Sequence, residues 1–112
     1  MNTNERLVGD ELQRRLWNAG FAACSTGGGF NAYAKVLADG KVLFICDNEN
    51  QLDDISDDDF IISLQEEGSP LAEFVKVGDT LSYYDHTNAA EVVRENNGAT
   101  IVAALSVFGV QI

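Results

Sequence analysis

The dipeptide Asp39-Gly40 constrains the fold of this chain more than any other short feature. It separates the apolar runs NAYAKVL and KVLFIC, and the tight turn of a two-residue hairpin needs positive φ at both central positions, which Asp and Gly tolerate. We therefore predict an antiparallel hairpin here. Both of its faces carry apolar groups, so each needs a covering layer. Counting outward from the turn pairs Val36 with Leu43, Ala34 with Ile45, Ala32 with Asp47, and Tyr33 with Cys46.

A helix is predicted before this hairpin, over about Asn4 to Ala19. Its apolar stripe recurs at four- and three-residue spacing, which is typical of a helix that packs one face on a core. Thr3 or Asn4 is suited to cap its start, and Gly20 to end it. The stripe comprises Val8, Leu12, Leu16 and Ala19, widened by Leu7 and Trp17.

The rest of the chain reads as short strands, one more helix and an apolar tail. The runs FAACS, FIISLQ, LAEFVKV and GDTLSYYD favour strands bounded by turn residues. A second helix is predicted through AAEVVREN, with Thr87 or Asn88 as its cap and Gly98 as its stop. The tail ATIVAALSVFGV is predicted to be a final strand. The 112 residues then form a single α+β domain, an antiparallel meander with an N-terminal helix and a second helix near the C-terminus.

The net charge of the chain limits the classes of molecule that it is expected to bind. Eighteen acids against seven bases give a net charge of −11. Direct binding to nucleic acid or to an anionic membrane surface needs the opposite sign, whereas a basic protein is favoured. The N-terminus lacks a basic region followed by an apolar stretch, so no cleaved signal is visible and a cytoplasmic protein is expected.

The negative charge is concentrated in one segment. No lysine or arginine lies between Lys41 and Lys76. A run of this kind is commonly a solvated loop, here one that would keep an edge strand from aggregating, or else an interaction segment. On the second interpretation its carboxylates are spaced like DNA phosphates in order of magnitude and would occupy a groove built for nucleic acid. The predicted partner-binding residues are Asp47, Glu49, Asp53, Asp54, Asp57, Asp58, Asp59, Glu66 and Glu67.

The segment STGGGFNAYAKVLADGKVLFICDN resembles a pattern found in small acidic phage and prophage proteins. In these, a helix precedes Thr-Gly-Gly-Gly and a hairpin whose second strand ends in an aspartate before an acidic loop. The resemblance covers Leu12 to about Val77. It implies a mobile-element origin, with the host cytoplasm as the site of action, and no catalytic residue. The functional hypothesis is a non-catalytic inhibitor of a basic nucleic-acid-binding host protein, of the DNA-mimic or anti-CRISPR type.

The residue types and their spacing give little support for a catalytic site or a metal site. His86 is the single histidine, so a nucleophile–histidine pair would have to use it. Asp47, Glu49, Gln51 and Asp53 have the alternate spacing of EF-hand ligands, but Leu52 occupies the position that needs glycine, and Asp58 the position of the bidentate glutamate. We therefore predict no catalytic residue, metal or cofactor.

Three alternatives remain open. A small ligand-binding or enzymatic domain would centre on the loop Gly27–Gly29, with Cys24, Tyr33, Cys46 and His86 as candidates. A structural component of a virion is equally compatible with the sequence. A homodimer would cover an exposed sheet face or edge. Cys24 and Cys46 have no zinc-site spacing and are expected to be free thiols unless the fold brings them close together.

Overall fold

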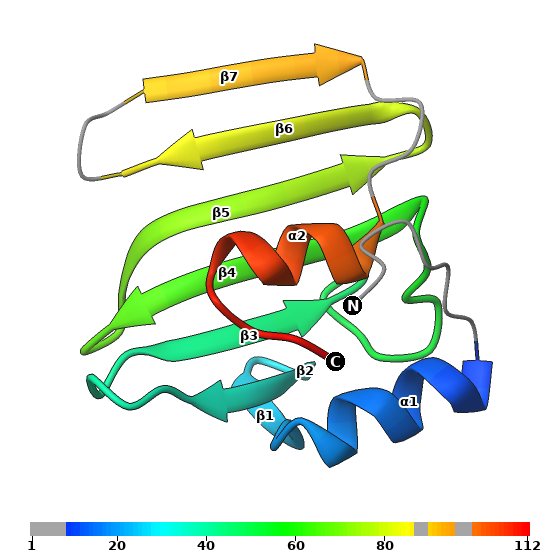
Figure 1. Ribbon diagram of the computed structural model, residues 1–112, viewed down its shortest axis with the longest axis vertical. Coiled ribbons are helices and arrows are strands. Elements are labelled where there is room, and N and C mark those ends of the chain that lie inside the picture. Colours follow the sequence, from blue (N-terminus) through cyan, green and yellow to red (C-terminus); the bar gives the residue numbers. More distant parts are fainter. Residues whose placement is uncertain (1–8, 87–89, 96–99) are drawn as a thin grey trace.

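The computed structural model describes residues 9–86, the backbone of 90–95, and residues 100–112. Its seven strands form one antiparallel sheet in which spatial order follows sequence order, and two helices accompany the sheet (Figure 1). No helix in these ranges is long and apolar enough to cross a membrane. The elements are α1 Gly9–Asn18, β1 Ala22–Gly27, β2 Phe30–Val36, β3 Val42–Cys46, β4 Asp59–Glu66, β5 Ser69–Val77, β6 Thr80–Asp85, β7 Ala90–Glu95 and α2 Ile101–Val107.

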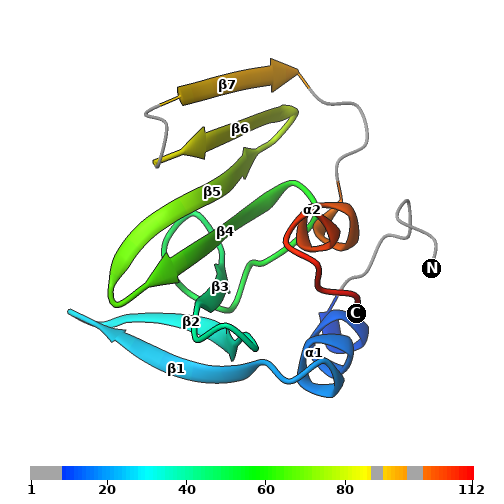
Figure 2. The same ribbon diagram turned by 60° about the vertical axis from the view of Figure 1, so that its left-hand side comes forward.

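The predicted fold class is confirmed: an α+β domain built on an antiparallel meander, with a helix near each end. Both helices lie on the same side of the sheet (Figure 2). Leu12 and Leu16 of α1 are buried there together with Leu105 of α2. Leu43 and Ile62, on β3 and β4, complete this contact and are fully buried. The opposite face of the sheet is covered by neither helix, and we call it the open face.

In the C-terminal quarter the prediction was a helix followed by a strand, and the structure has a strand followed by a helix. Residues 90–95 are strand β7, paired with β6 from Asp85↔Ala90 to Thr80↔Glu95, and the helix lies in the tail. The two adjacent valines in this segment are β-branched, and such residues favour a strand where β6 is available to pair with it. The tail is helical because Thr100 caps it, its side chain accepting from the Ala103 amide at 3.1 Å, and because one stripe faces the core. The predicted caps Thr87 and Asn88 and the stop Gly98 lie outside the described residues.

The hairpin at Asp39-Gly40 exists, but its predicted register is wrong by one residue. The Leu37 amide donates to the Lys41 carbonyl at 2.7 Å, which closes a three-residue loop with Gly40 at φ 85. Val36 therefore pairs with Val42, and Tyr33 with Ile45. A slip of one residue exchanges the faces of one strand relative to the other. The predicted pairs Val36–Leu43, Ala34–Ile45, Ala32–Asp47 and Tyr33–Cys46 are thus not formed.

Helix α1 ends where the sequence predicts. Gly20 adopts φ 100, and the Phe21 amide donates to the Leu16 carbonyl at 3.0 Å. Lys35 of β2 donates to the Ala19 carbonyl at 2.6 Å, which places a cation at the negative end of the helix. Trp17, predicted to widen the apolar stripe, is instead 70% exposed. The predicted start of the helix lies outside the described residues.

Candidate functional site

The acidic segment between β3 and β4 is a folded loop, and Asp47 is its organising residue. The Asp47 carboxylate is 1% exposed. One of its oxygens accepts from the amides of Glu49 and Gln51, each at 2.9 Å, and the other accepts from the Asp54 amide at 3.2 Å. Asp47 was predicted to contact a partner, and this is corrected: its charge is turned inward onto the backbone of its own loop.

Asp57 is likewise turned inward, toward α2. It is 3% exposed, and its Oδ1 accepts from the amide of Ile101, the first residue of the helix, at 2.8 Å. An anion at a helix N-terminus is electrostatically favourable. The Asp57 carbonyl also accepts from the buried Lys76 ammonium at 2.9 Å. Asp57 therefore fastens the acidic loop to α2 and does not form part of a partner-binding surface.

Asp59 is the third inward-turned carboxylate. Its Oδ1 accepts from both the backbone and the side-chain amide of Asn48, each at 2.8 Å. The same side-chain amide donates to the Lys76 carbonyl at 2.7 Å, which links the two ends of the loop to β5. Ile55 and Phe60 add apolar anchors, since both belong to the core. The loop is consequently held at several points along its length.

The remaining carboxylates of the loop are exposed. Glu49, Asp53, Asp54 and Asp58 all lie at the surface, and the side chain of Asp58 is 63% exposed. The Lys76 ammonium lies 3.6 Å from Oδ1 of Asp58 and is itself only 2% exposed. Lys76 therefore supports the loop from inside the protein, and the four acids are exposed at its surface.

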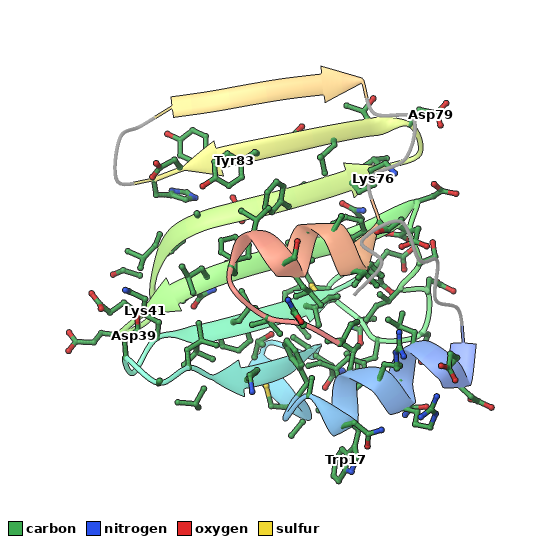
Figure 3. All side chains as sticks on the ribbon, viewed as in Figure 1. Trp17, Asp39, Lys41, Lys76, Asp79 and Tyr83 are labelled. Atoms are coloured by element: carbon green, nitrogen blue, oxygen red, sulfur yellow. The ribbon has the colours of Figure 1, made fainter. Side chains whose placement is uncertain are left out.

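Sequence reasoning missed Asp79, which joins this surface. Successive strands of a meander alternate in direction, so the turns β1–β2, β3–β4 and β5–β6 share one end of the sheet. The Gly78 amide donates to the Asp58 carbonyl at 2.9 Å and fastens the β5–β6 turn to the acidic loop. Asp79 is exposed there, beside Lys76 in Figure 3. We define the acidic end by its exposed carboxylates: Glu49, Asp53, Asp54, Asp58 and Asp79.

Glu66 and Glu67 do not extend this surface, which corrects their predicted place in it. They lie at the far end of β4, an eight-residue strand. At about 3.3 Å per residue, that strand separates them from the acidic end by roughly 23 Å. They share the opposite end with Asp39, whose carboxylate is paired with Lys41 at 2.8 Å and lies at the other side of the molecule in Figure 3.

The glycine loop Gly27–Gly29 serves as the β1–β2 turn and contacts the acidic loop. Gln51 donates to the Gly29 carbonyl at 2.9 Å and accepts from Asn31 at 2.8 Å. The candidates for a ligand site around it are only partly brought together. Cys24 and Cys46 line a cavity of about 530 Å³ on the open face, whereas Tyr33 packs against the core on the other face.

His86 lies beside this cavity on the open face. Its Nε2 is 3.3 Å from Oε1 of Glu73, and its ring packs against Tyr84 with centroids 4.4 Å apart. No cysteine or serine hydroxyl is among its hydrogen-bond partners in the described part of the chain, so the geometry contains no nucleophile–histidine pair there. The same residues include no group of three or more His, Cys, Asp or Glu side chains placed to hold a metal ion.

The two cysteines are free. They lie on β1 and β3, two strand spacings apart, which is roughly 10 Å and beyond the reach of a disulfide. The pKa of the Cys46 thiol is raised to about 11, first by burial and then by the negative charges of Asp47 and Asp59. Cys46 is therefore an unreactive neutral thiol at neutral pH, and Cys24 is the more accessible of the two.

Comparisons with protein-family models, with curated proteins and with solved structures gave no match. The function must therefore be argued from the geometry. That geometry offers a rigidly supported anionic surface at one end of the sheet and an open, mixed polar and apolar cavity on one face. The first is suited to bind a cationic partner, and the second has the dimensions of a ligand pocket.

Proposed function

We propose that this chain is a non-catalytic binding protein that engages a basic, nucleic-acid-binding protein through the acidic end. The observation that carries the proposal is that the loop aspartates fall into two groups with different side-chain orientations. Asp47, Asp57 and Asp59 bond inward and hold the loop, while the other carboxylates face solvent. A loop needed only for solubility requires no such internal scaffold.

The electrostatics support the same proposal. Five exposed carboxylates lie on two adjacent turns, and Lys76, 3.6 Å from Asp58, is itself buried. Crowding like charges costs free energy in the isolated protein, and a cationic partner removes that cost. Partners that bind DNA phosphates present lysine and arginine in a groove, so they offer the complementary surface.

In its most concrete form, the proposal is an inhibitor that occupies the nucleic-acid groove of a host protein. A phage-encoded inhibitor of a defence nuclease complex, of the anti-CRISPR type, is such a protein. The resemblance of the segment from Leu12 to about Val77 to small acidic phage proteins supports this form. The wider proposal, binding to a basic partner, stands on the acidic end alone.

The test is affinity capture from a host lysate with two matched variants. The first carries Asp53→Asn, Asp54→Asn and Asp79→Asn, which change exposed side chains and leave the inward-bonding carboxylates of the loop intact. The control carries Asp39→Asn, Glu66→Gln and Glu67→Gln at the opposite end. Each removes three negative charges, so the two differ in where charge is lost and not in how much.

We expect the wild type and the control to retain a basic protein at low salt and to release it at high salt, because exposed charges are screened. The first variant should retain at least tenfold less. Equal retention by both variants would contradict the proposal, since binding would then follow net charge and not the acidic end.

A ligand-binding function is the second candidate, and the cavity on the open face favours it. Its volume of about 530 Å³ falls within the range of small-molecule pockets. Apolar walls from Phe44 and Ile61 face neutral polar groups and one carboxylate, Glu73. A thermal-shift screen with nucleotides, metabolites and divalent metals tests it, because a ligand that binds the native state raises the unfolding midpoint.

A further inference from the structure

The sheet has two edges, and they differ in charge. Strand β7 at one edge has the sequence AEVVRE, with three charged residues in six. Strand β1 at the other edge has the sequence AACSTG, with no charge and no proline. Charged residues and proline are the usual protection of an edge strand against pairing with another chain. Strand β1 therefore lacks the protection that β7 has.

The uncharged edge belongs to a longer uncharged stretch. No charged residue lies between Arg15 and Lys35, in a chain whose net charge is −11. This stretch includes two exposed aromatic side chains, Trp17 at 70% and Phe30 at 47%. Helix α1 and strand β1 lie on the same side of the molecule in both ribbon views, and Trp17 points outward there (Figures 1, 2 and 3).

We infer that β1 is the interface for a second copy of this chain, which adds its own β1 in antiparallel orientation. The residues of β1 are exposed apart from the half-buried Cys24, so the described part of the molecule leaves this edge accessible. Regular pairing with β2 runs from Ala22 to Ser25 before the register shifts toward Gly27. The same four residues offer an undistorted strand to the partner, and Cys24 lies near the centre of the joined pair.

A second copy is favoured over other occupants by the charge distribution. Two chains of net charge −11 repel each other over most of their surfaces, and the stretch from Leu16 to Ala34 is where that repulsion is weakest. A two-fold axis through β1 reverses strand direction, so the two acidic ends lie at opposite ends of the joined sheet. Trp17 of each copy adds apolar area beside the short strand pair, as aromatic residues commonly do at interfaces.

The test is the mass of the purified protein in solution, measured by light scattering or sedimentation over a range of concentrations. We expect the mass to rise from one chain, 12.1 kDa, toward twice that value as concentration increases. Ala23→Lys places a charge on the exposed edge and should keep the mass at one chain. Val77→Lys adds the same charge at an exposed position on β5 and should leave dimerisation unchanged.

Cross-linking gives an independent readout of the pairing. Pairing centred on Cys24 places the two Cys24 thiols directly opposite each other, within disulfide reach, and a mild oxidant that accepts two electrons would join them. Cys24→Ser should abolish the covalent dimer, and Cys46→Ser should not. A mass of one chain at every concentration, or a dimer that survives Ala23→Lys, would overturn the inference. Neither outcome bears on the acidic end, which this interface leaves free.

Discussion

At the scale of single residues, aspartates a few positions apart differ completely in role. Asp47 makes three bonds to loop amides and is buried, whereas Asp53 and Asp54 face solvent. The difference follows from position: an Asp at the end of a strand can fold the following turn back onto its own carboxylate. Acidic composition therefore overstates the charge that a partner would meet.

Replacing Asp47 by alanine should destabilise the protein strongly. Three amides lose a charged acceptor, and such bonds contribute on the order of 1.5–3 kcal/mol each, with losses that overlap within one loop. We expect Asp47→Ala to lower the free energy of unfolding by about 3 kcal/mol in urea denaturation. Asp53→Ala, the control, should change it by less than about 0.5 kcal/mol. A small effect of Asp47→Ala would show that the loop does not depend on this carboxylate.

The two cysteines should differ in reactivity. Because the pKa of Cys46 is raised to about 11, its thiol is neutral at pH 8, whereas Cys24 is half-exposed. We expect a thiol reagent at pH 8 to modify one cysteine per native chain, and Cys24→Ser to remove that fast reaction. Fast modification of the Cys24→Ser protein would contradict the burial of Cys46.

The raised pKa of Cys46 also predicts a pH dependence of stability. The folded-state pKa lies above the ordinary thiol value of about 8.5, so the folded state favours the neutral thiol. Its contribution is complete below about pH 8.5 and is lost as pH rises toward 11. The free energy of unfolding should therefore fall less steeply above pH 9 in Cys46→Ala than in the wild type.

At the scale of elements, local signals located most strands but not every boundary or register. The runs around Phe60–Leu64 and Leu71–Val77 were predicted as strands and are β4 and β5. AEVVRE and IVAALSV are predicted the wrong way round because both are short segments whose local sequence suits either structure. Pairing with β6 makes the first segment a strand, and packing on the core makes the second a helix. Neither contact is visible in a local sequence pattern.

The hairpin register shows the same limit. Asp39-Gly40 signalled a turn, but whether the loop has two or three residues depends on whether Asp39 adopts positive φ, and only Gly40 does. That one dihedral decides which residues share a face along the whole hairpin.

The β4–β5 turn provides a test at this scale. Glu67 adopts φ 53 and Gly68 φ 81, the pattern of a turn that favours Asn-Gly. A left-handed backbone costs an ordinary residue about 1 kcal/mol, and asparagine less. We expect Glu67→Asn to raise the free energy of unfolding by roughly 0.5–1 kcal/mol and Glu66→Asn to give no gain. A lower free energy of unfolding in Glu67→Asn would contradict this account of the turn.

At the scale of the whole molecule, the meander decides which charges act together. Asp79 is twenty-one residues from Asp58 in sequence, yet a hydrogen bond between Gly78 and Asp58 joins their turns. Glu66 is nearer in sequence to Asp58 and lies a full strand away. The sequence therefore predicts the acidic loop as a candidate site. Which carboxylates share the acidic end depends on the number and direction of the strands, which local sequence does not show.

The central claim is that the acidic end occupies a groove that otherwise binds nucleic acid. The most direct measurement is competition: the captured partner, saturated with labelled duplex DNA, is titrated with the wild type and with the Asp53→Asn, Asp54→Asn, Asp79→Asn variant. We predict that the wild type displaces the DNA completely and that the variant needs at least tenfold more protein to do so. A stable complex that holds the partner, the DNA and this chain together would contradict the claim.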